Sequence, residues 1–200
     1  MSEQLSIGNK FTVSSLKGPC LANELARKIK SSTVIANKNI KVAQSIGKLI
    51  STSYYQVEFS KDIRGVEISS AIKNIYSMII GSGEGLNTSS SIFRKSISEM
   101  IYLIKHFKGK EETIYGLAGI GDLYVSAMGG RNSKMGKYLG KGFTFKYAKK
   151  KFMPNDTIEG AELASEIAPF VFKKINLKKI PLMIELLKSI TKNKKLNIRW

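Results

Sequence analysis

The spacing of hydrophobic and polar residues changes near residue 60. Before that point, short runs rich in β-branched and aromatic residues predict strands over residues 11–16, 32–37 and 54–59. Between the last two runs, the apolar residues of 38–52 recur at helical spacing. A strand, a helix and a strand within about thirty residues predict a βαβ unit, the building block of a parallel sheet.

After residue 62 the pattern becomes mainly helical. Within residues 66–81, four isoleucines recur at spacings of four, three and four, which places them on one face of a helix. The opposite side of this helix is Ser-rich and carries Lys73. Further helices are predicted over residues 89–107, 156–172 and 182–191.

Glycine, proline and capping residues punctuate these elements. Residues 18–30 predict a loop that enters a helix, and residues 116–123 a Gly-punctuated turn between helices. GSGEG at 81–85 follows a helical run, so it predicts a helix end and a turn, not a dinucleotide-binding loop. Asp156 is expected to cap the next-to-last helix, and Pro181 to begin the last one.

Together these elements predict a mainly α fold in two parts. Residues 1–60 are expected to be the end of a parallel α/β sheet, and residues 61–200 a helical domain. A lone pair of strands is a poor fold by itself. We therefore expect further strands of this sheet to come from a segment ahead of the chain.

The charge of the chain favours anionic partners. Its formal net charge is +18, and residues 131–200 contribute 17 basic and 5 acidic residues to it. Such a chain attracts phosphorylated metabolites, nucleotides, nucleic acid or acidic surfaces. Lysines on solvated helix faces, or a Lys-rich genome, explain the same composition without any function.

Single residues and short segments exclude other classes of site. One cysteine, Cys20, leaves no internal disulfide, and one histidine, His106, argues against a His-based metal site, so we expect no metal. No run approaches the roughly 20 apolar residues that span a membrane. The first ten residues lack an apolar signal core, so we expect a cytoplasmic protein.

Four stretches carry candidate chemistry: GPCLANE (18–24), VEISSAIKN (66–74), GLAGIGDLYVSAMGGRN (116–132) and IEGAE (158–162). Each alone has a simple structural explanation as a turn, a cap or a solvated charge. In this order and spacing they resemble the glycerol-3-phosphate dehydrogenase family, whose motifs GPSFAxE, VELxGALKN, GLAGLGDL, RN and Q/E-G they match. The spacing and sequence of GGRN follow the eukaryotic-like members. The resemblance runs from about Leu5 to Leu187.

The resemblance implies a fold and a reaction. The fold is a helical substrate-binding domain of the 6-phosphogluconate-dehydrogenase C-terminal-like type, preceded by a remnant of a Rossmann domain. The reaction moves a hydride between NAD or NADP and the secondary alcohol carbon of glycerol 3-phosphate, giving dihydroxyacetone phosphate. Its products serve carbohydrate and glycerophospholipid metabolism, and relatives are usually homodimers.

The resemblance also assigns residues. Lys73 would take the hydroxyl proton, which requires burial or nearby cations to lower the pKa of a lysine. Asp122 would bind substrate or hold Lys73; a helix or loop cap is the structural alternative. The remaining assignments are Gly18, Ser126, Arg131 and Asn132 at the substrate, with Ala22, Arg131 and Glu159 at the cofactor. Cys20 stands where bacterial members have Ser, and no substrate contact is assigned to it.

Two alternatives to a complete dehydrogenase remain. The family's GxGxxG half, which anchors the dinucleotide, is absent from these 200 residues. The chain would then be a fragment, a partner of a separate N-terminal Rossmann half, or a truncated non-enzymatic remnant. A basic helical module for anions or nucleic acid is the other reading, supported by aromatic and basic residues interleaved over 143–151. Because no nucleic-acid motif is recognisable, that reading is not favoured.

Overall fold

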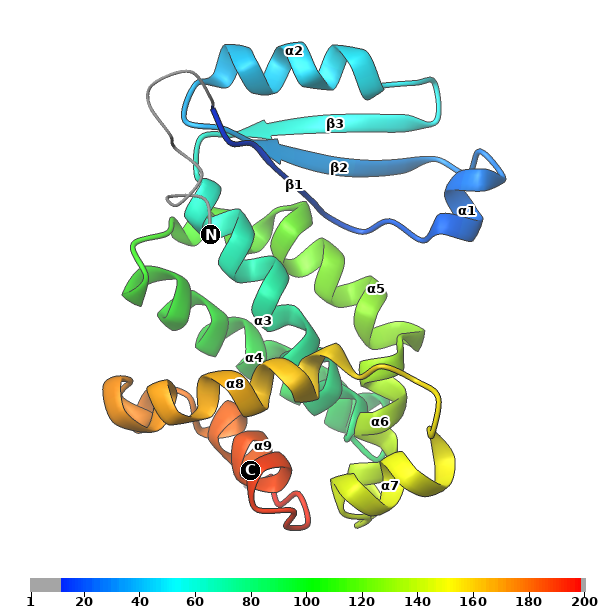
Figure 1. Ribbon diagram of the computed structural model, residues 1–200, viewed down its shortest axis with the longest axis vertical. Helices are drawn as coiled ribbons and strands as arrows, with labels where there is room; N and C mark the ends of the chain where they lie inside the picture. The colour runs from blue at the N-terminus through cyan, green and yellow to red at the C-terminus, as the bar shows by residue number, and fades with distance from the viewer. Residues whose placement is uncertain (1–11, 199–200) are drawn as a thin grey trace.

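The computed structural model describes residues 12–198, and its N-terminal part is a small sheet (Figure 1). The strands are β1 (Ser15–Lys17), β2 (Ser31–Ala36) and β3 (Tyr55–Ser60). Their order is β1-β2-β3, with β1 antiparallel to β2 and β2 parallel to β3. The short helix α1 (Ala22–Ala26) follows β1, and α2 (Ile40–Ile50) lies over one face of the sheet.

The sheet confirms one prediction and corrects another. β2, α2 and β3 form the expected βαβ unit, with Thr33 paired to Val57 in a parallel register. The first strand is shorter than predicted and runs antiparallel to β2. Just before it, the side-chain amide of Asn37 donates to the Val13 carbonyl at 3.0 Å and to the Ser14 hydroxyl at 2.7 Å. These side-chain bonds stand where backbone pairing would continue. Residue 11 of the predicted strand, and the segment before it, lie outside the described residues.

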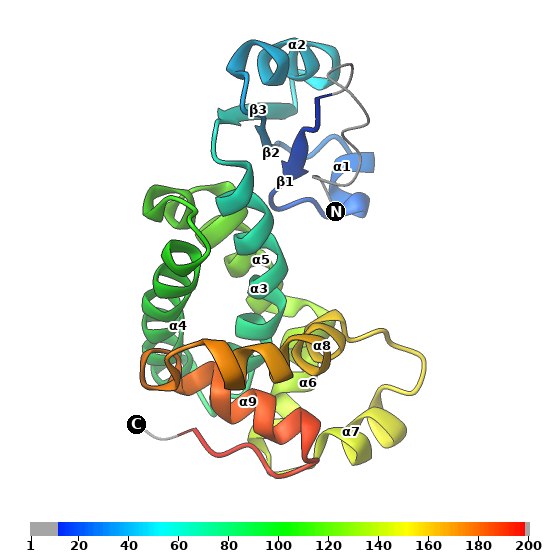
Figure 2. The ribbon, with the colours of Figure 1, turned by 60° about the vertical axis from the view of Figure 1, so that its left-hand side comes forward.

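Helices make up the rest of the described chain. They are α3 (Ile63–Gly81), α4 (Leu86–His106), the 3-10 turn η1 (Glu111–Tyr115), the π-helical turn η2 (Leu117–Gly121), α5 (Asp122–Gly129), α6 (Arg131–Gly140), α7 (Phe145–Phe152), α8 (Glu159–Lys174), the 3-10 turn η3 (Leu177–Lys179) and α9 (Pro181–Thr191). Figure 2 shows α3 running from the sheet into the helical part, with α8 and α9 crossing its far end. Within residues 12–198, no helix combines the length and apolarity that crossing a membrane requires.

The helix α3 is the centre of the helical part. Its second half is buried on all sides, and Ile75, Met78 and Ile79 have no exposed surface. α6 crosses it at close range, because a Cβ atom at Gly136 would lie 2.0 Å from the Met78 carbonyl oxygen. The sequence predicted one apolar face for this helix. In the structure, neighbouring helices surround the second half of α3, and most of its surface there is apolar.

Two local predictions were wrong and one is confirmed. Residues 117–121 form a π-helical turn that runs directly into α5, not a turn between helices, and the missing side chain of Gly119 lets this turn lie against η1. Asp156 does not cap α8, which begins at Glu159 after Ile158 and has no side-chain cap. The backbone N–H of Asp156 instead closes a turn onto the Met153 carbonyl at 3.3 Å. Pro181 begins α9 as expected.

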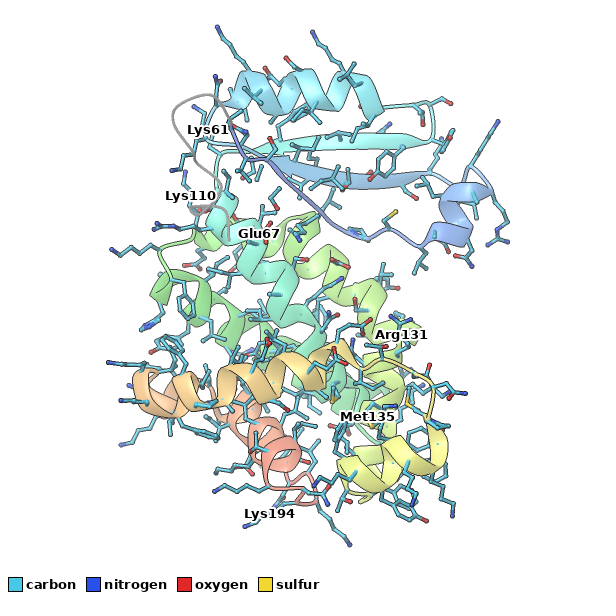
Figure 3. The ribbon with its side chains drawn as sticks, in the orientation of Figure 1. Lys61, Glu67, Lys110, Arg131, Met135 and Lys194 are labelled. Carbon is cyan, nitrogen blue, oxygen red and sulfur yellow. The ribbon has the colours of Figure 1, made fainter. Side chains whose placement is uncertain are left out.

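The sheet is attached to the helical part through α3. Glu67, labelled in Figure 3, accepts a hydrogen bond from the Ser15 hydroxyl at 2.5 Å and lies 3.7 Å from the Lys17 ammonium. A small apolar cluster lies beneath these contacts: Val34, Ala36, Val66 and Ala118. Two neighbouring layers of the molecule therefore meet along the first turns of α3, close to the candidate site.

Candidate functional site

A cleft of about 830 Å³ opens between the loop after β1 and helices α3, α5, α6 and α8. It brings together segments that are up to 141 positions apart in the chain. Seven residues assigned by the family resemblance line it: Gly18, Lys73, Asp122, Ser126, Arg131, Asn132 and Glu159. The four motif stretches therefore converge on one cavity.

Lys73 and Asp122 form an ion pair in the lining of this cleft. The Lys73 ammonium contacts Oδ1 of Asp122, and their side chains are only 17% and 6% exposed. Lys73 comes from the polar side of α3, and Asp122 from the first residue of α5. Asp122 contacts the lysine, and no side-chain cap hydrogen bond is formed at the start of α5, where the π-helical turn continues into the helix.

A second charged cluster lies where α6 and α8 begin. The guanidinium of Arg131 donates to Oε1 of Glu159, and the Asn132 amide donates to Oε2 of Glu159 at 3.2 Å. The side-chain oxygen Oδ1 of Asn132 accepts from the backbone N–H of Gly160 at 2.8 Å. Asn132 therefore joins the first turns of both helices. In Figure 3, Arg131 lies on the opposite side of the molecule from Lys61 and Lys110.

Glu159 is charged in this cluster. Partial burial raises the pKa of Glu159, but hydrogen bonds from its own backbone N–H, from Arg131 and from Asn132 outweigh that effect and hold the pKa below its ordinary value. The carboxylate is therefore ionised at neutral pH. Arg131 and Glu159 are 56% and 39% exposed, so their pair is far more open to water than the pair of Lys73 and Asp122.

Glycines allow the walls of the cleft to approach one another. Gly18 has φ of +133°, a conformation that side chains rarely adopt, and it turns the chain from β1 into the cleft. A Cβ atom at Gly160 would lie 2.5 Å from the Asn74 carbonyl oxygen and 2.8 Å from Oδ1 of Asn132. The start of α8 can therefore lie directly against α3.

Two further residues assigned by the resemblance, Ser126 and Ala22, differ in their position relative to the cleft. Ser126 lies on α5 four residues after Asp122, which puts both on the same side of that helix. Ala22 is the first residue of α1 and is exposed, outside the residues that line the cleft. Its assignment to the cofactor stays a prediction.

The cleft also contains residues that the motif comparison did not single out. Leu21, Glu24, Asn74, Tyr124 and Met128 all line it. All five stand inside the quoted motif stretches, and Asn74 directly follows Lys73, so adjacency was an available signal. Tyr124 and Met128 are 58% and 66% exposed, and only the direction in which α5 faces places them at the cleft.

The aromatic and basic segment of residues 143–152 lies on other elements. The rings of Phe143 and Tyr147 stack with centroids 5.5 Å apart, and those of Tyr138 and Phe152 at 4.4 Å. These aromatic side chains pack on one another, which does not favour their use as a platform for nucleic-acid bases.

Sequence comparison agrees with the geometry of the cleft. Residues 62–198 match the model of the C-terminal part of NAD-dependent glycerol-3-phosphate dehydrogenase. The chain belongs to this family. The NADP-dependent glycerol-3-phosphate dehydrogenase of Archaeoglobus fulgidus is 36% identical over 64% of the chain, and the NAD(P)-dependent one of Halothermothrix orenii is 33% identical over 84%. These matches span 41% and 50% of the two relatives.

Solved glycerol-3-phosphate dehydrogenases share the fold. The crystal structure of the Coxiella burnetii protein superposes with a TM-score of 0.82 at 25% identity, covering 92% of this chain and 57% of that one. The Saccharomyces cerevisiae structure gives 0.87 at 23% identity, covering 98% and 60%. These likenesses confirm the predicted fold class, a helical C-terminal domain preceded by the end of an α/β sheet. The chain spans about half the length of the relatives.

Proposed function

We propose that this chain is the substrate-binding part of a dehydrogenase that interconverts sn-glycerol 3-phosphate and dihydroxyacetone phosphate with NAD or NADP. The observation that carries the proposal is the Lys73–Asp122 pair, little exposed to solvent, which lines the same cleft as Arg131. In this division, residues 1–60 complete the nucleotide-binding domain, and residues 61–200 form the substrate-binding domain. A proton-transfer group and a phosphate-binding group then share one cavity.

Lys73 is the proposed proton acceptor. NAD or NADP, when bound, would supply the hydride acceptor for the secondary alcohol carbon of glycerol 3-phosphate. In the reduction of dihydroxyacetone phosphate, the Lys73 ammonium donates a proton to the oxygen that becomes the hydroxyl. In the oxidation of glycerol 3-phosphate, the neutral amine of Lys73 accepts that proton as the carbonyl forms. Asp122 keeps the side chain of Lys73 directed into the cleft, because its carboxylate contacts the same nitrogen. The low exposure of both side chains restricts the positions that they can adopt and limits competition from water.

Arg131 and the start of α6 are the proposed site of the substrate phosphate. The planar guanidinium can donate two parallel hydrogen bonds to the oxygens of one phosphate. α6 has no side-chain cap, so backbone N–H groups of its first turn remain as donors for an anion. Asn132 keeps this turn in place, and the assignments of Gly18 and Ser126 to the substrate fit their position in the lining of the cleft.

The dinucleotide requires a further protein segment. A GxGxxG turn is absent from these 200 residues, and Arg131, Glu159 and Ala22 alone offer no site for the pyrophosphate. We assign that role to an N-terminal Rossmann half, either in the same polypeptide or as a separate partner. Exposed apolar side chains on the sheet part support its docking there: Val13, Leu16, Leu21 and Ile29. A homodimer of the assembled enzyme is part of the same proposal.

The test is the reduction of dihydroxyacetone phosphate, followed by loss of NADH or NADPH absorbance. We expect activity when the chain is mixed with a Rossmann half of a relative, and none from the chain alone. Lys73→Ala should lower kcat by about 10²- to 10⁴-fold. Lys48→Ala, at an exposed position of α2, is the matched control and should change little.

Two results would contradict the proposal. Activity of the chain alone would show that the nucleotide site does not need another segment. Full activity of the Lys73→Ala mixture would remove this lysine from the proton transfer.

A further inference from the structure

The cations of the cleft are already neutralised. Although the chain carries a formal charge of +18, the described residues that line the cleft include two cations, Lys73 and Arg131, and three carboxylates. Each cation contacts one of these carboxylates, Asp122 or Glu159. The lining of the cleft therefore has a net negative formal charge. A phosphate monoester can bind there only if one of the two cations exchanges its carboxylate partner for the phosphate.

The two ion pairs differ in how readily they exchange. Lys73 and Asp122 are 17% and 6% exposed, so separating them would leave an unpaired charge in a buried place. Arg131 and Glu159 are 56% and 39% exposed, and water and salt weaken the attraction between them. Arg131 is thus the cation that an incoming anion can recruit.

We propose that Glu159 is a competitor built into the site: its carboxylate occupies the guanidinium of Arg131 and sets how tightly the cleft binds a phosphate monoester. The inference rests on the proposed function, because it concerns the same phosphate-binding group. Binding exchanges one Arg131–carboxylate contact for an Arg131–phosphate contact. Glu159 acts through Arg131 and is a positioning residue.

Asn132 holds Glu159 in place while Arg131 changes partners. Its amide nitrogen donates to Oε2 of Glu159 at 3.2 Å, while its oxygen is bound to the Gly160 N–H, and the side chain is buried. When Arg131 turns to a phosphate, Glu159 keeps a hydrogen-bond donor on its second oxygen. The carboxylate is therefore retained beside the guanidinium and recaptures it after the anion leaves.

The experiment measures binding of glycerol 3-phosphate and of inorganic phosphate to the full 200-residue chain by calorimetry at low ionic strength. Glu159→Gln removes the charge but keeps the oxygen that accepts from Asn132. The matched control is Glu162→Gln, an exposed carboxylate three residues further along α8. Arg131→Gln alone and together with Glu159→Gln isolates the part of binding that passes through Arg131. Circular dichroism checks that every variant is folded.

We expect Glu159→Gln to tighten binding of both anions about 2- to 5-fold, the upper part of the range for a partly exposed charge pair. Glu162→Gln should stay within about twofold, and Glu159→Gln should have no effect when Arg131 is replaced. Tightening that requires Arg131 supports the proposal.

Other outcomes separate this inference from the proposed function. If the chain binds phosphate through Arg131 but Glu159→Gln binds no more tightly, the competitor role is wrong and the phosphate site stands. Equal tightening by Glu162→Gln would also overturn the inference, because net charge alone would explain it. If neither the unmodified chain nor Glu159→Gln shows binding that depends on Arg131, both the inference and the proposed phosphate site fail.

Discussion

The helical part and the sheet part of this molecule are stabilised to very different extents. The large cluster of the helical part contains 29 buried residues, whereas the cluster beneath the sheet contains four, two of which belong to α3 and η2. The sheet part also exposes Leu16 and Leu49, at 48% and 85%. The helical part carries Lys73, Asp122 and Arg131 on a well-packed frame, and the sheet part supplies the opposite wall of the cleft from a weaker one.

This difference separates two demands on the protein. Proton transfer needs groups fixed within a few tenths of an ångström, which a packed helical core provides. A wall that meets another domain needs an apolar surface that stays exposed until the partner arrives. Substitutions in the two parts should therefore differ in their effect on the free energy of unfolding.

The largest difference is expected between two leucines. Leu139→Ala in α6 leaves a cavity at a position with no exposed surface, and should lower the free energy of unfolding by about 2–5 kcal/mol. Leu16→Ala on β1 should cost less than about 1 kcal/mol, because that side chain is already half in water. Urea unfolding followed by circular dichroism compares them. Equal costs would show that the sheet part is as tightly packed as the helical part.

A smaller effect is expected where helices cross. Gly136→Ala would place a Cβ atom 2.0 Å from the Met78 carbonyl oxygen, so α3 and α6 must move apart. We expect a loss of about 2–3 kcal/mol in the same unfolding measurement. The control Gly129→Ala, in α5, meets no atom within 4 Å and should be neutral or stabilising. A neutral Gly136→Ala would contradict the close crossing.

The smallest effect is a pH dependence of the helical part. Glu99 is 4% exposed, and burial raises its pKa from 4.5 to about 7, although hydrogen bonds from Leu182, Met183 and Tyr76 oppose the rise. Because the folded state holds this proton more tightly than the unfolded one, stability is greatest below pH 4.5 as far as Glu99 is concerned, and falls as pH rises toward 7. Between pH 5 and 8 the loss should be about 2 kcal/mol.

The control for this prediction is Glu99→Gln, which removes the titrating group but keeps one of the two oxygens that accept from the N–H groups of Leu182 and Met183 at the start of α9. Its free energy of unfolding should change less between pH 5 and 8 than that of the unmodified chain. An identical change in both proteins would mean that other groups cause the pH dependence.

Much of the fold was predictable because local patterns and final contacts agree. The βαβ unit, the helix over residues 66–81 and the start of the last helix at Pro181 follow from spacing and from the backbone preferences of proline. The turn predicted at 116–123 failed because glycine is compatible with a loop and with close packing alike. In the structure Gly119 lies directly against Ile114 of η1, and the local sequence pattern does not show this contact. Asp156 failed for a similar reason, since a nearby turn uses its backbone before α8 begins.

The sequence by itself determined the family, the mainly α fold class and the identity of the candidate residues, because motif letters and periodicity are properties of the chain. The tertiary structure decided how those residues are paired. Lys73 with Asp122 is buried, and Arg131 with Glu159 is partly in water. Such pairing depends on where α3, α5, α6 and α8 meet, and on the solvent left between them. The paired residues are 28 and 49 positions apart in the chain, so local sequence patterns show neither their pairing nor their exposure to water.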